Sequence, residues 1–316
     1  MHLTRSGVCQ GIHNLYRQQL SSRLSSSQHL PFFQSPNFNS LKKKKNMAVN
    51  APKVKMASLA VINYEALANK DAAEIEKLVQ ASQSVGMFYL DLRGPRTNAI
   101  FEDVSAIFKT GNEFFDLAPE SEEKTQSLRE GMERGYHVGK GYEYYEIARD
   151  EFQLSKWVLP ATFVPQKDRI TRTIKIFNDA VQTVLAELCV AVDIKIPELS
   201  DDPTVPSDTA LKLVYKPPIH DAGKVIHPWH TDFGLATLLW YDEVTTQVPI
   251  YDEKGKQTEE WETVPVVEGS VLINVADELS AKSGGRLHST VHRVVAPPGE
   301  KRVRNGIIYL LRPYKS

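Results

Sequence analysis

The sequence of 316 residues has few cysteines, no long hydrophobic run and almost no net charge. It contains two cysteines, Cys9 in a polar N-terminal stretch and Cys189 in a predicted helix, so a disulfide framework is not expected and a reducing compartment fits. No apolar stretch approaches the length of a transmembrane helix. The formal net charge is -1, so composition gives no reason to expect binding to nucleic acid or to an anionic membrane.

Residues 1–54 lack acidic side chains, and the first acidic residue of the chain is Glu65. The stretch is rich in Ser, Gln and Asn and carries a run of lysines at 42–45. This composition predicts a disordered or targeting extension, and an alternative is that translation starts at Met47. We expect a cytoplasmic protein, or a mitochondrial one if residues 1–46 are a transit peptide.

The rest of the chain has the composition of a folded protein, with 41% hydrophobic residues over the whole sequence. Apolar spacing predicts helices that begin at Asp71 and that span Ala99–Phe115 and Ile170–Val192. From Ala210 onward the pattern changes to short strands separated by turns, which suggests a sandwich or jelly roll. We therefore expect a mainly β fold with helices (α+β), with an N-terminal helical section and a sandwich or jelly-roll core.

Two histidines and one aspartate form a candidate metal-ligand set. His230 and Asp232 stand two residues apart, directly before the apolar run Leu235–Trp240, and residues i and i+2 of a strand point to the same face. His292 lies about sixty residues later in the β-branched run Ser289–Val295, which also predicts a strand. Two histidines and one carboxylate are the ligands of the facial triad, which holds non-haem Fe(II) and leaves coordination positions open.

A His-x-Asp tripeptide alone is weak support, because nine histidines in a chain of this length produce one by chance fairly often. His288 is an alternative third ligand, because it lies four residues before His292 and shares its strand parity. The context of the tripeptide therefore decides the interpretation.

The context is a set of motifs in a fixed order: His230-Thr231-Asp232, Thr246-Gln247-Val248, Val264-Pro265, Asn274-Val275-Ala276-Asp277, Gly284-Gly285-Arg286-Leu287 and Ser289-Thr290-Val291-His292-Arg293-Val294. As a set they resemble the iron(II)/2-oxoglutarate-dependent dioxygenase superfamily, in its isopenicillin N synthase-like branch. The resemblance covers roughly residues 58–313. It implies a double-stranded β-helix, with an N-terminal dioxygenase segment at 55–165 and the helix plus jelly-roll domain at 166–316. It also implies that His230, Asp232 and His292 bind Fe(II).

The resemblance further implies an arginine that grips the distal carboxylate of 2-oxoglutarate, two residues before a serine on a late strand. Guanidinium suits this role because it forms two parallel hydrogen bonds with a carboxylate. Aligning the strand Ile307–Leu311 selects Arg304, whereas counting from His292 favours Arg302. Neither choice has the serine, and Gly306 takes its place after Arg304. The alternative for both arginines is a solvated basic loop.

Relatives usually have a tyrosine directly before a pair of prolines, and that tyrosine can touch 2-oxoglutarate. Here Lys216 precedes the prolines and Tyr215 lies one position earlier. A shift of one residue along a strand changes the face on which a side chain lies, so Tyr215 is a weaker candidate for the cosubstrate site. A Gly- and Tyr-rich stretch at 131–145 corresponds to a loop that covers the active site in the family, or is an ordinary turn.

By resemblance, we expect Fe(II)- and 2-oxoglutarate-dependent oxidation of a small organic molecule, in which O2 is consumed and succinate and CO2 are the coproducts. Hydroxylation or desaturation is the expected outcome, and a place in secondary metabolism is expected by analogy. The lost serine leaves an iron oxidase of the isopenicillin N synthase type, which does not use 2-oxoglutarate, as an alternative. Gly306 and Lys216 leave a catalytically impaired jelly-roll binding protein as another. We expect a monomer with no nucleic-acid or membrane partner.

Overall fold

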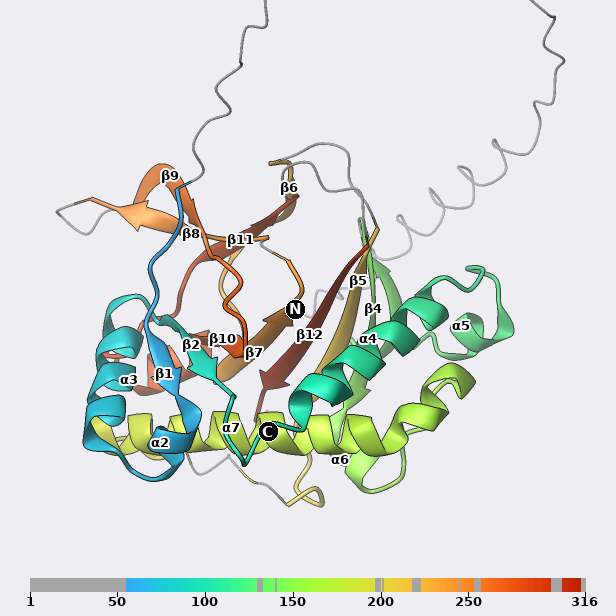
Figure 1. Cartoon of the computed structure of the whole chain (residues 1–316), viewed down its shortest axis with the longest axis horizontal. Coiled ribbons are helices and arrows are strands. Elements are labelled where there is room, and N and C mark those ends of the chain that lie inside the picture. The colour runs from blue at the N-terminus through green and yellow to red at the C-terminus, as the bar shows by residue number, and fades with distance from the viewer. Residues whose placement is uncertain are drawn as a thin grey trace, which may run out of the picture. The chain divides into compact units, whose positions relative to one another are not determined.

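A computed structural model describes residues 55–129, 133–139, 141–196, 200, 202–217, 223–243, 245–252, 257–296 and 303–313. The predicted N-terminal extension, residues 1–54, lies outside these ranges. The described residues belong to one compact unit of strands and helices (Figure 1). None of its described helices combines the length and the apolar character that crossing a membrane requires.

Within the described residues, the larger of two sheets has eight strands in the order β1-β2-β10-β7-β12-β5-β4-β3. Their bounds are β1 Val61–Asn63, β2 Met87–Asp91, β3 Gly135–Gly139, β4 Tyr142–Ala148, β5 Ala210–Lys216, β7 Ala236–Tyr241, β10 Ser270–Val275 and β12 Arg304–Leu311. Neighbouring strands are antiparallel except β1 and β2, which are parallel. Because β2 pairs with β10, the N-terminal segment contributes to the same sheet as the later strands. The division of the chain at residue 165 stays a proposal.

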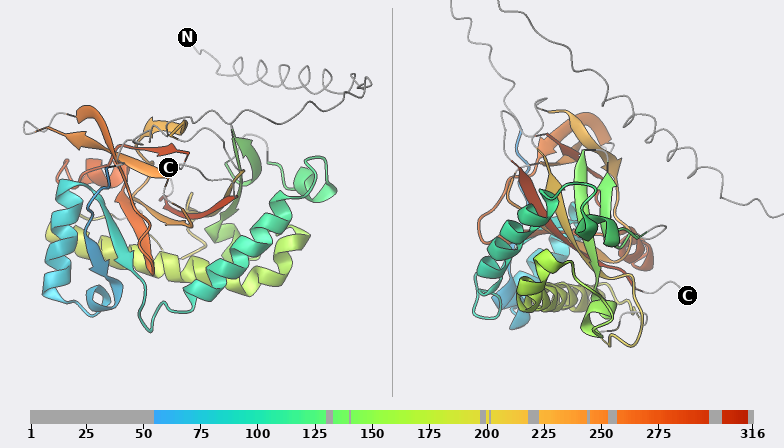
Figure 2. Two further views of the ribbon diagram at one scale, coloured as in Figure 1. Left: turned by 45° about the horizontal axis from the view of Figure 1, so that its top comes forward. Right: turned by 90° about the vertical axis from the view of Figure 1, so that its right-hand side faces the viewer.

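The smaller sheet contains the four strands β6 (Val225–His230), β11 (His292–Val295), β8 (Thr246–Tyr251) and β9 (Gln257–Thr263), in that order, within the described ranges. It lies on one side of the larger sheet, and helix α7 (Lys167–Ala191) crosses the other side (Figures 1 and 2). Two facing sheets with helices packed outside them give a jelly-roll core, so the expected α+β fold class is confirmed.

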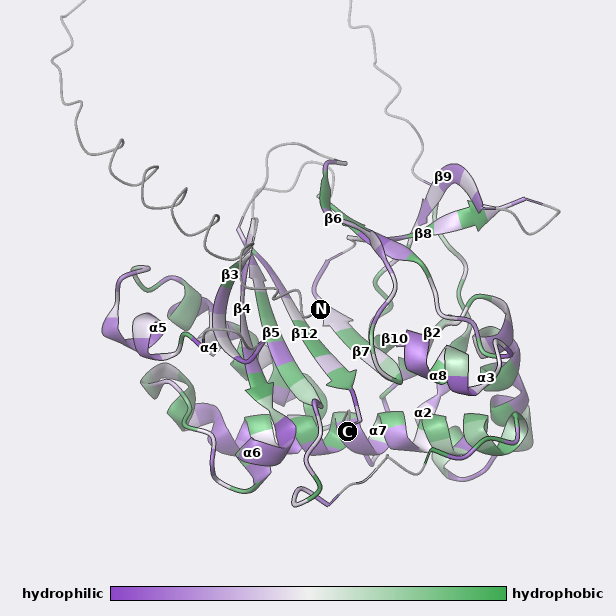
Figure 3. Cartoon of the chain, turned by 180° about the vertical axis from the view of Figure 1, so that it is seen from behind, coloured by the Kyte–Doolittle hydropathy of each residue, from purple (hydrophilic) through white to green (hydrophobic). Residues whose placement is uncertain are grey.

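The remaining described helices are α2 (Tyr64–Ala68), α3 (Ala72–Ser84), α4 (Ile100–Phe115), α5 (Glu122–Gln126), α6 (Arg149–Gln153), the 3-10 helix η1 (Ala161–Gln166) and α8 (Asp277–Lys282). The predicted helix over Ile170–Val192 is confirmed as α7. Its buried residues recur every three or four positions, among them Ile170, Ile174, Phe177, Val181 and Leu185. In Figure 3, α7 alternates between hydrophobic and hydrophilic stretches, as a helix with one buried face must.

The larger sheet has two faces with different roles, because successive strand residues point to opposite sides. On β12, Ile307 and Tyr309 are fully buried in the core, where the Tyr309 ring meets Phe177 of α7 at a centroid distance of 6.3 Å. Ile308 and Leu310 point to the other side, into the space beneath the smaller sheet. One face therefore packs on helices, and the other face lines a cavity.

Two elements differ from the sequence-based expectation. The residues that lead into the His-x-Asp motif were not assigned to a strand from sequence, but they form β6, which pairs with β11 despite Pro228 and a shift in register. The Gly- and Tyr-rich stretch forms the hairpin β3–β4 on the larger sheet, and residues 131, 132 and 140 within it lie outside the described ranges. Strand pairing overrides local propensity in both cases.

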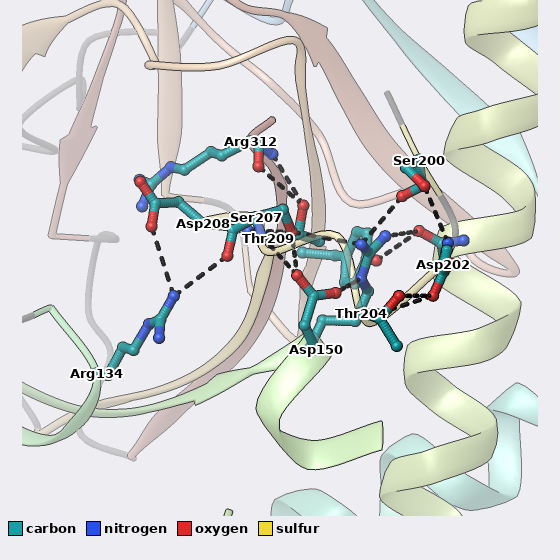
Figure 4. A network of polar contacts seen from close by, with 12 residues as sticks. Arg134, Asp150, Ser200, Asp202, Thr204, Ser207, Asp208, Thr209 and Arg312 are labelled. Carbon is teal, nitrogen blue, oxygen red and sulfur yellow. Dashed lines mark hydrogen bonds and ion pairs between the residues drawn. The ribbon is translucent and has the colours of Figure 1, made fainter. Parts of the chain in front are cut away.

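A polar network holds the end of β12 beside the start of β5 (Figure 4). The Asp150 carboxylate accepts hydrogen bonds from the backbone N–H and the hydroxyl of Ser207, both at 2.7 Å. The Thr209 hydroxyl donates to the Arg312 carbonyl at 3.1 Å and accepts from its backbone N–H at 3.2 Å. The buried Arg149 side chain donates to Asp150 at 2.7 Å. These bonds fix the place where Arg312 leaves the strand.

Gly86 allows the N-terminal segment to lie against the stretch that leads into His292. Its φ is +74°, and a Cβ built there would lie 1.8 Å from the carbonyl oxygen of His288. Beside this approach, the His288 N–H donates to the Ser82 carbonyl at 2.9 Å, and the Thr290 hydroxyl donates to the Val85 carbonyl. The C-terminal end of α3 therefore fixes the residues that lead into β11.

We predict that Gly86→Ala lowers the free energy of unfolding by about 3 kcal/mol or more, because a left-handed conformation and a backbone clash act together. Gly284→Ala is the matched control: its φ is +66° with nothing within 4 Å of the added Cβ, so about 1 kcal/mol is expected. Urea unfolding of both variants measures the difference. Equal losses would show that the close approach at Gly86 contributes nothing.

Candidate metal centre

The structure brings His230, Asp232 and His292 together. Strands β6 and β11 are neighbours, and their register places His230 opposite His292. Asp232 follows β6, with its Oδ1 3.6 Å from Nε2 of His230 and 3.8 Å from Nε2 of His292. One donor atom from each residue lies within 4.8 Å of the others. These separations are short enough for the three side chains to reach a single metal ion.

Asp232 reaches this point from a turn, not from the strand that its spacing predicted. β6 ends at His230, and the Asp277 N–H, at the start of α8, donates to the Asp232 carbonyl at 2.9 Å. The Glu278 N–H donates to the Gly234 carbonyl, also at 2.9 Å. The first turn of α8 therefore sets the position of the carboxylate.

Hydrogen bonds define which imidazole nitrogen each histidine offers. Nδ1 of His230 lies 2.8 Å from the Pro228 carbonyl, and Nδ1 of His292 lies 3.1 Å from the Thr290 carbonyl. A carbonyl oxygen only accepts, so each Nδ1 carries the proton and donates it. The Nε2 lone pairs are then available, and both face Asp232. Burial lowers the pKa of His230 and nearby His292 lowers it further, which favours the neutral form that binds metals.

The Asp232 carboxylate is kept ionised inside a largely buried site. Burial raises its pKa, but nearby His292, hydrogen bonds from Asn274 and Thr237, and His230 together lower it, and the net effect holds the pKa below its usual value. The Asn274 side-chain amide donates to Oδ2 at 3.0 Å, while Oδ1 faces the two histidines. Two neutral nitrogens and one carboxylate oxygen form a donor set that fits Fe(II).

Asp277 joins the two segments that carry the donors. Its Oδ2 accepts from the Thr231 hydroxyl at 2.9 Å, and its Oδ1 accepts from the Ser289 hydroxyl at 2.6 Å. Thr231 lies between His230 and Asp232, and Ser289 lies three residues before His292. Asp277 belongs to one of the sequence motifs, but no role was predicted for it. Its signal was an acidic residue directly after an apolar strand.

The other histidines near the site are not members of the donor group found among the described residues. His288, the alternative third ligand, has its ring 6.4 Å from that of Tyr251, and its backbone contacts α3. His227 lies beside the group, with its Nδ1 3.1 Å from Nδ1 of His230. That nitrogen of His230 faces away from Asp232. His227 therefore contacts the His230 ring and does not reach the point where a metal ion would bind.

The three donors lie on the wall of a cavity of about 410 Å³. Its apolar lining comes from both sheets: Val214, Ile226, Leu239, Val294, Ile308 and Leu310. Its polar lining includes Tyr142 and Tyr144 of β4, Lys212 and Lys216 of β5, and Tyr241 of β7. A cavity of this size and mixed lining suits a small organic molecule.

The three residues predicted for the cosubstrate site lie in different places relative to the metal cavity. Tyr215 lies on the core face of β5, where its hydroxyl donates to Asp116 at 2.9 Å and its ring stacks on Phe115, so it does not reach the cavity. Arg302 lies outside the described residues. Arg304 shares the strand face of Ile308 but lines a smaller neighbouring cavity. It is 3% exposed, and its guanidinium donates to the Pro217 carbonyl at 3.4 Å.

Gly306 leaves room for the ring of Tyr241. The two residues are opposite each other on β12 and β7, and a Cβ at 306 would lie 2.7 Å from Cε1 of Tyr241. A serine at this position would therefore displace the ring. The glycine in place of the serine is thus matched by a tyrosine ring that lies where the serine side chain would be.

Comparison with known proteins agrees with this geometry. Residues 207–313 match the family described as the 2OG-Fe(II) oxygenase superfamily. A 2-oxoglutarate-dependent dioxygenase of Gibberella zeae is 28% identical over 274 residues, which are 82% of this chain and 80% of that protein. A 2-oxoglutarate-dependent dioxygenase of a Dothideomycetidae species is 27% identical over 82% of this chain and 83% of that protein.

The fold has solved counterparts. The crystal structure of a full-length Neurospora crassa protein in complex with alpha-KG superposes with a TM-score of 0.66 at 24% identity, covering 84% of this chain and 89% of that chain. The Arabidopsis thaliana dioxygenase for auxin oxidation 1 superposes with a TM-score of 0.63 at 18% identity, covering 82% and 94%. With the matched family, the shared fold and the His-x-Asp…His triad in place, the chain belongs to the 2OG-Fe(II) oxygenase superfamily as a non-haem iron, 2-oxoglutarate-dependent dioxygenase.

Proposed function

We propose that this dioxygenase hydroxylates or desaturates a small organic molecule that enters the 410 Å³ cavity beside His230, Asp232 and His292. The observation that carries the proposal is the convergence of two Nε2 lone pairs and one ionised carboxylate on the wall of that cavity. When bound there, Fe(II) with 2-oxoglutarate supplies O2 activation, and succinate and CO2 are released.

The chain itself holds and orients this donor set. Nε2 of His230, Nε2 of His292 and Oδ1 of Asp232 would bind the metal, while the Pro228 and Thr290 carbonyls keep both imidazoles in the required tautomer. Asn274 and Asp277 fix the carboxylate and the two donor-bearing segments. These three protein ligands would leave further coordination positions of the ion open for the cosubstrate and O2.

The cavity offers the substrate a wall with both apolar and charged side chains. Lys212 Nζ lies 2.7 Å from Glu146 Oε2 and sits over the Tyr144 ring at 4.5 Å. The Arg312 guanidinium donates to Glu133 at 3.1 Å. These paired charges border the tyrosines of β4, so the proposed substrate combines an apolar body with polar groups that can hydrogen-bond.

We predict that His230→Ala, Asp232→Ala and His292→Ala each abolish the weak visible band that Fe(II) and 2-oxoglutarate give together without oxygen. Each change removes one of three ligands, so the chelate no longer forms. His288→Ala is the matched control, because it removes a nearby histidine outside the donor group. The prediction fails if the band survives loss of any of the three ligands, or disappears in the His288 variant.

Asp277→Ala is predicted to weaken Fe(II) affinity by roughly ten- to a hundredfold, although Asp277 is not a ligand, because the Thr231 and Ser289 segments lose their shared acceptor. Glu278→Ala, one residue later on α8, serves as the control and should leave affinity within about twofold; its carboxylate lies 3.8 Å from Lys282 on the helix surface. Competition with a chromogenic chelator measures both affinities. Equal affinities for the two variants would contradict a bridging role for Asp277.

We predict that the iron-loaded chain converts labelled 2-oxoglutarate to succinate in the presence of O2, and that His230→Ala does not. Iron-dependent O2 uptake without succinate would instead identify an oxidase of the isopenicillin N synthase type. Iron binding with neither O2 uptake nor succinate across a panel of small molecules would favour a binding protein. Quantifying succinate and O2 in the same samples separates the three outcomes.

A further inference from the structure

Lys216 is a buried cation at one end of the metal cavity. It is the last residue of β5, it is 8% exposed, and it contributes to the lining of the cavity. Its Nζ lies over the Tyr241 ring, 5.3 Å from the centroid. In the part of the chain that the structure describes, no hydrogen bond or ion pair of this ammonium is found. A buried ammonium is costly unless a counter-charge reaches it.

The residue opposite Lys216 makes this cost larger. Arg304 on β12 is its cross-strand partner, and like charges directly opposite each other destabilise a sheet. Burial and, after it, the Arg304 charge lower the pKa of Lys216 to about 8, while Asp242 acts in the opposite direction. The site therefore gains stability from an added anion.

The nearby carboxylates are turned toward other groups. Nε of Arg304 lies 4.0 Å from the Glu243 carboxylate, which is itself largely buried. Asp242 accepts from the backbone N–H of Asn305 at 3.0 Å and from its side-chain amide at 3.5 Å. Arg304 thus has an acidic neighbour inside the protein, whereas Lys216 faces the cavity.

Lys216 and Tyr241 stand between Arg304 and the metal. Both line the metal cavity and also the small cavity that Arg304 and Gly306 border. Burial raises the pKa of Tyr241 and the charge of Asp232 raises it further, so the phenol lies within electrostatic reach of the metal ligands. A molecule that extends from the metal along Tyr241 therefore meets the Lys216 ammonium before it meets Arg304.

We propose that Lys216 binds the distal carboxylate of 2-oxoglutarate, with Arg304 behind it as supporting charge. This inference rests on the proposed function, because it requires the cosubstrate to chelate at the metal. It explains two features of this chain together. The Tyr241 ring occupies the space above Gly306, and a lysine stands at 216 with its ammonium over that ring. An ammonium from the neighbouring strand thus takes the place of the serine hydroxyl that relatives have at the position of Gly306.

The test is an anaerobic titration of the Fe(II)-loaded full chain with 2-oxoglutarate, and separately with pyruvate, which lacks the distal carboxylate. Both dissociation constants are read from the visible band. Lys216→Met, which keeps the stem and removes the charge, is expected to weaken 2-oxoglutarate binding roughly ten- to a hundredfold and to leave pyruvate binding within about twofold. Lys216→Arg is expected to retain most of the affinity for 2-oxoglutarate.

Lys77→Met is the control, because Lys77 lies on α3 with an exposed side chain and lines neither cavity. It should leave the affinity for 2-oxoglutarate within about twofold. The midpoint of thermal unfolding of the metal-free protein provides a second readout. Lys216→Met is expected to raise it, since a buried charge opposite another charge is removed.

The inference is overturned if Lys216→Met leaves 2-oxoglutarate affinity unchanged, or weakens both ligands equally. A large loss for Arg304→Lys with no loss for Lys216→Met would assign the carboxylate to Arg304 instead. If the unmodified chain gives no band with either ligand, the proposed function itself fails, and that result is distinct from a failure of Lys216 alone.

Discussion

The metal centre depends on one carboxylate that is not a ligand. Asp277 accepts hydrogen bonds from Thr231 and Ser289, which belong to segments about sixty residues apart in the chain. Through these bonds and its backbone N–H, the start of α8 holds the turn that carries Asp232 and the stretch that enters β11. Pairing of β6 with β11 then places the two imidazoles opposite each other. These contacts hold the three donor-bearing residues in place, which reduces the reorganisation that metal binding requires.

The alternation of side chains along the strands decides which residues take part in chemistry. On β5, Tyr215 packs into the helical core, while Lys216, one position later, faces the cavity. On β12 the same alternation sends Tyr309 toward α7 and Ile308 toward the cavity. A single sheet therefore serves the core with one face and the site with the other, and a change of one residue in register exchanges the two roles.

The strongest features of fold and site were predictable from sequence. The buried face of α7 repeats every three to four residues, so that helix was located correctly. The triad stands in a specific order of motifs, and the structure brings its three predicted residues together. Strand β6 was missed because Pro228 and two histidines do not have strand propensity, and pairing with β11 is a tertiary effect. From sequence, Lys216 was only a departure from a family pattern. Its relation to Tyr241 and Gly306 requires the register of three strands, which local sequence does not encode.

The close approach at Gly86 ties the first elements of the fold to the last ligand. The stretch before His292 packs against Ser82, Val85 and Gly86. The three metal-binding residues all come from much later in the chain. Metal binding and the folding of α3 are therefore thermodynamically linked, since whatever favours the ordered His292 segment also favours the helix end that holds it. Occupancy of the iron site is therefore expected to stabilise the C-terminal end of α3, a segment that contributes no metal ligand.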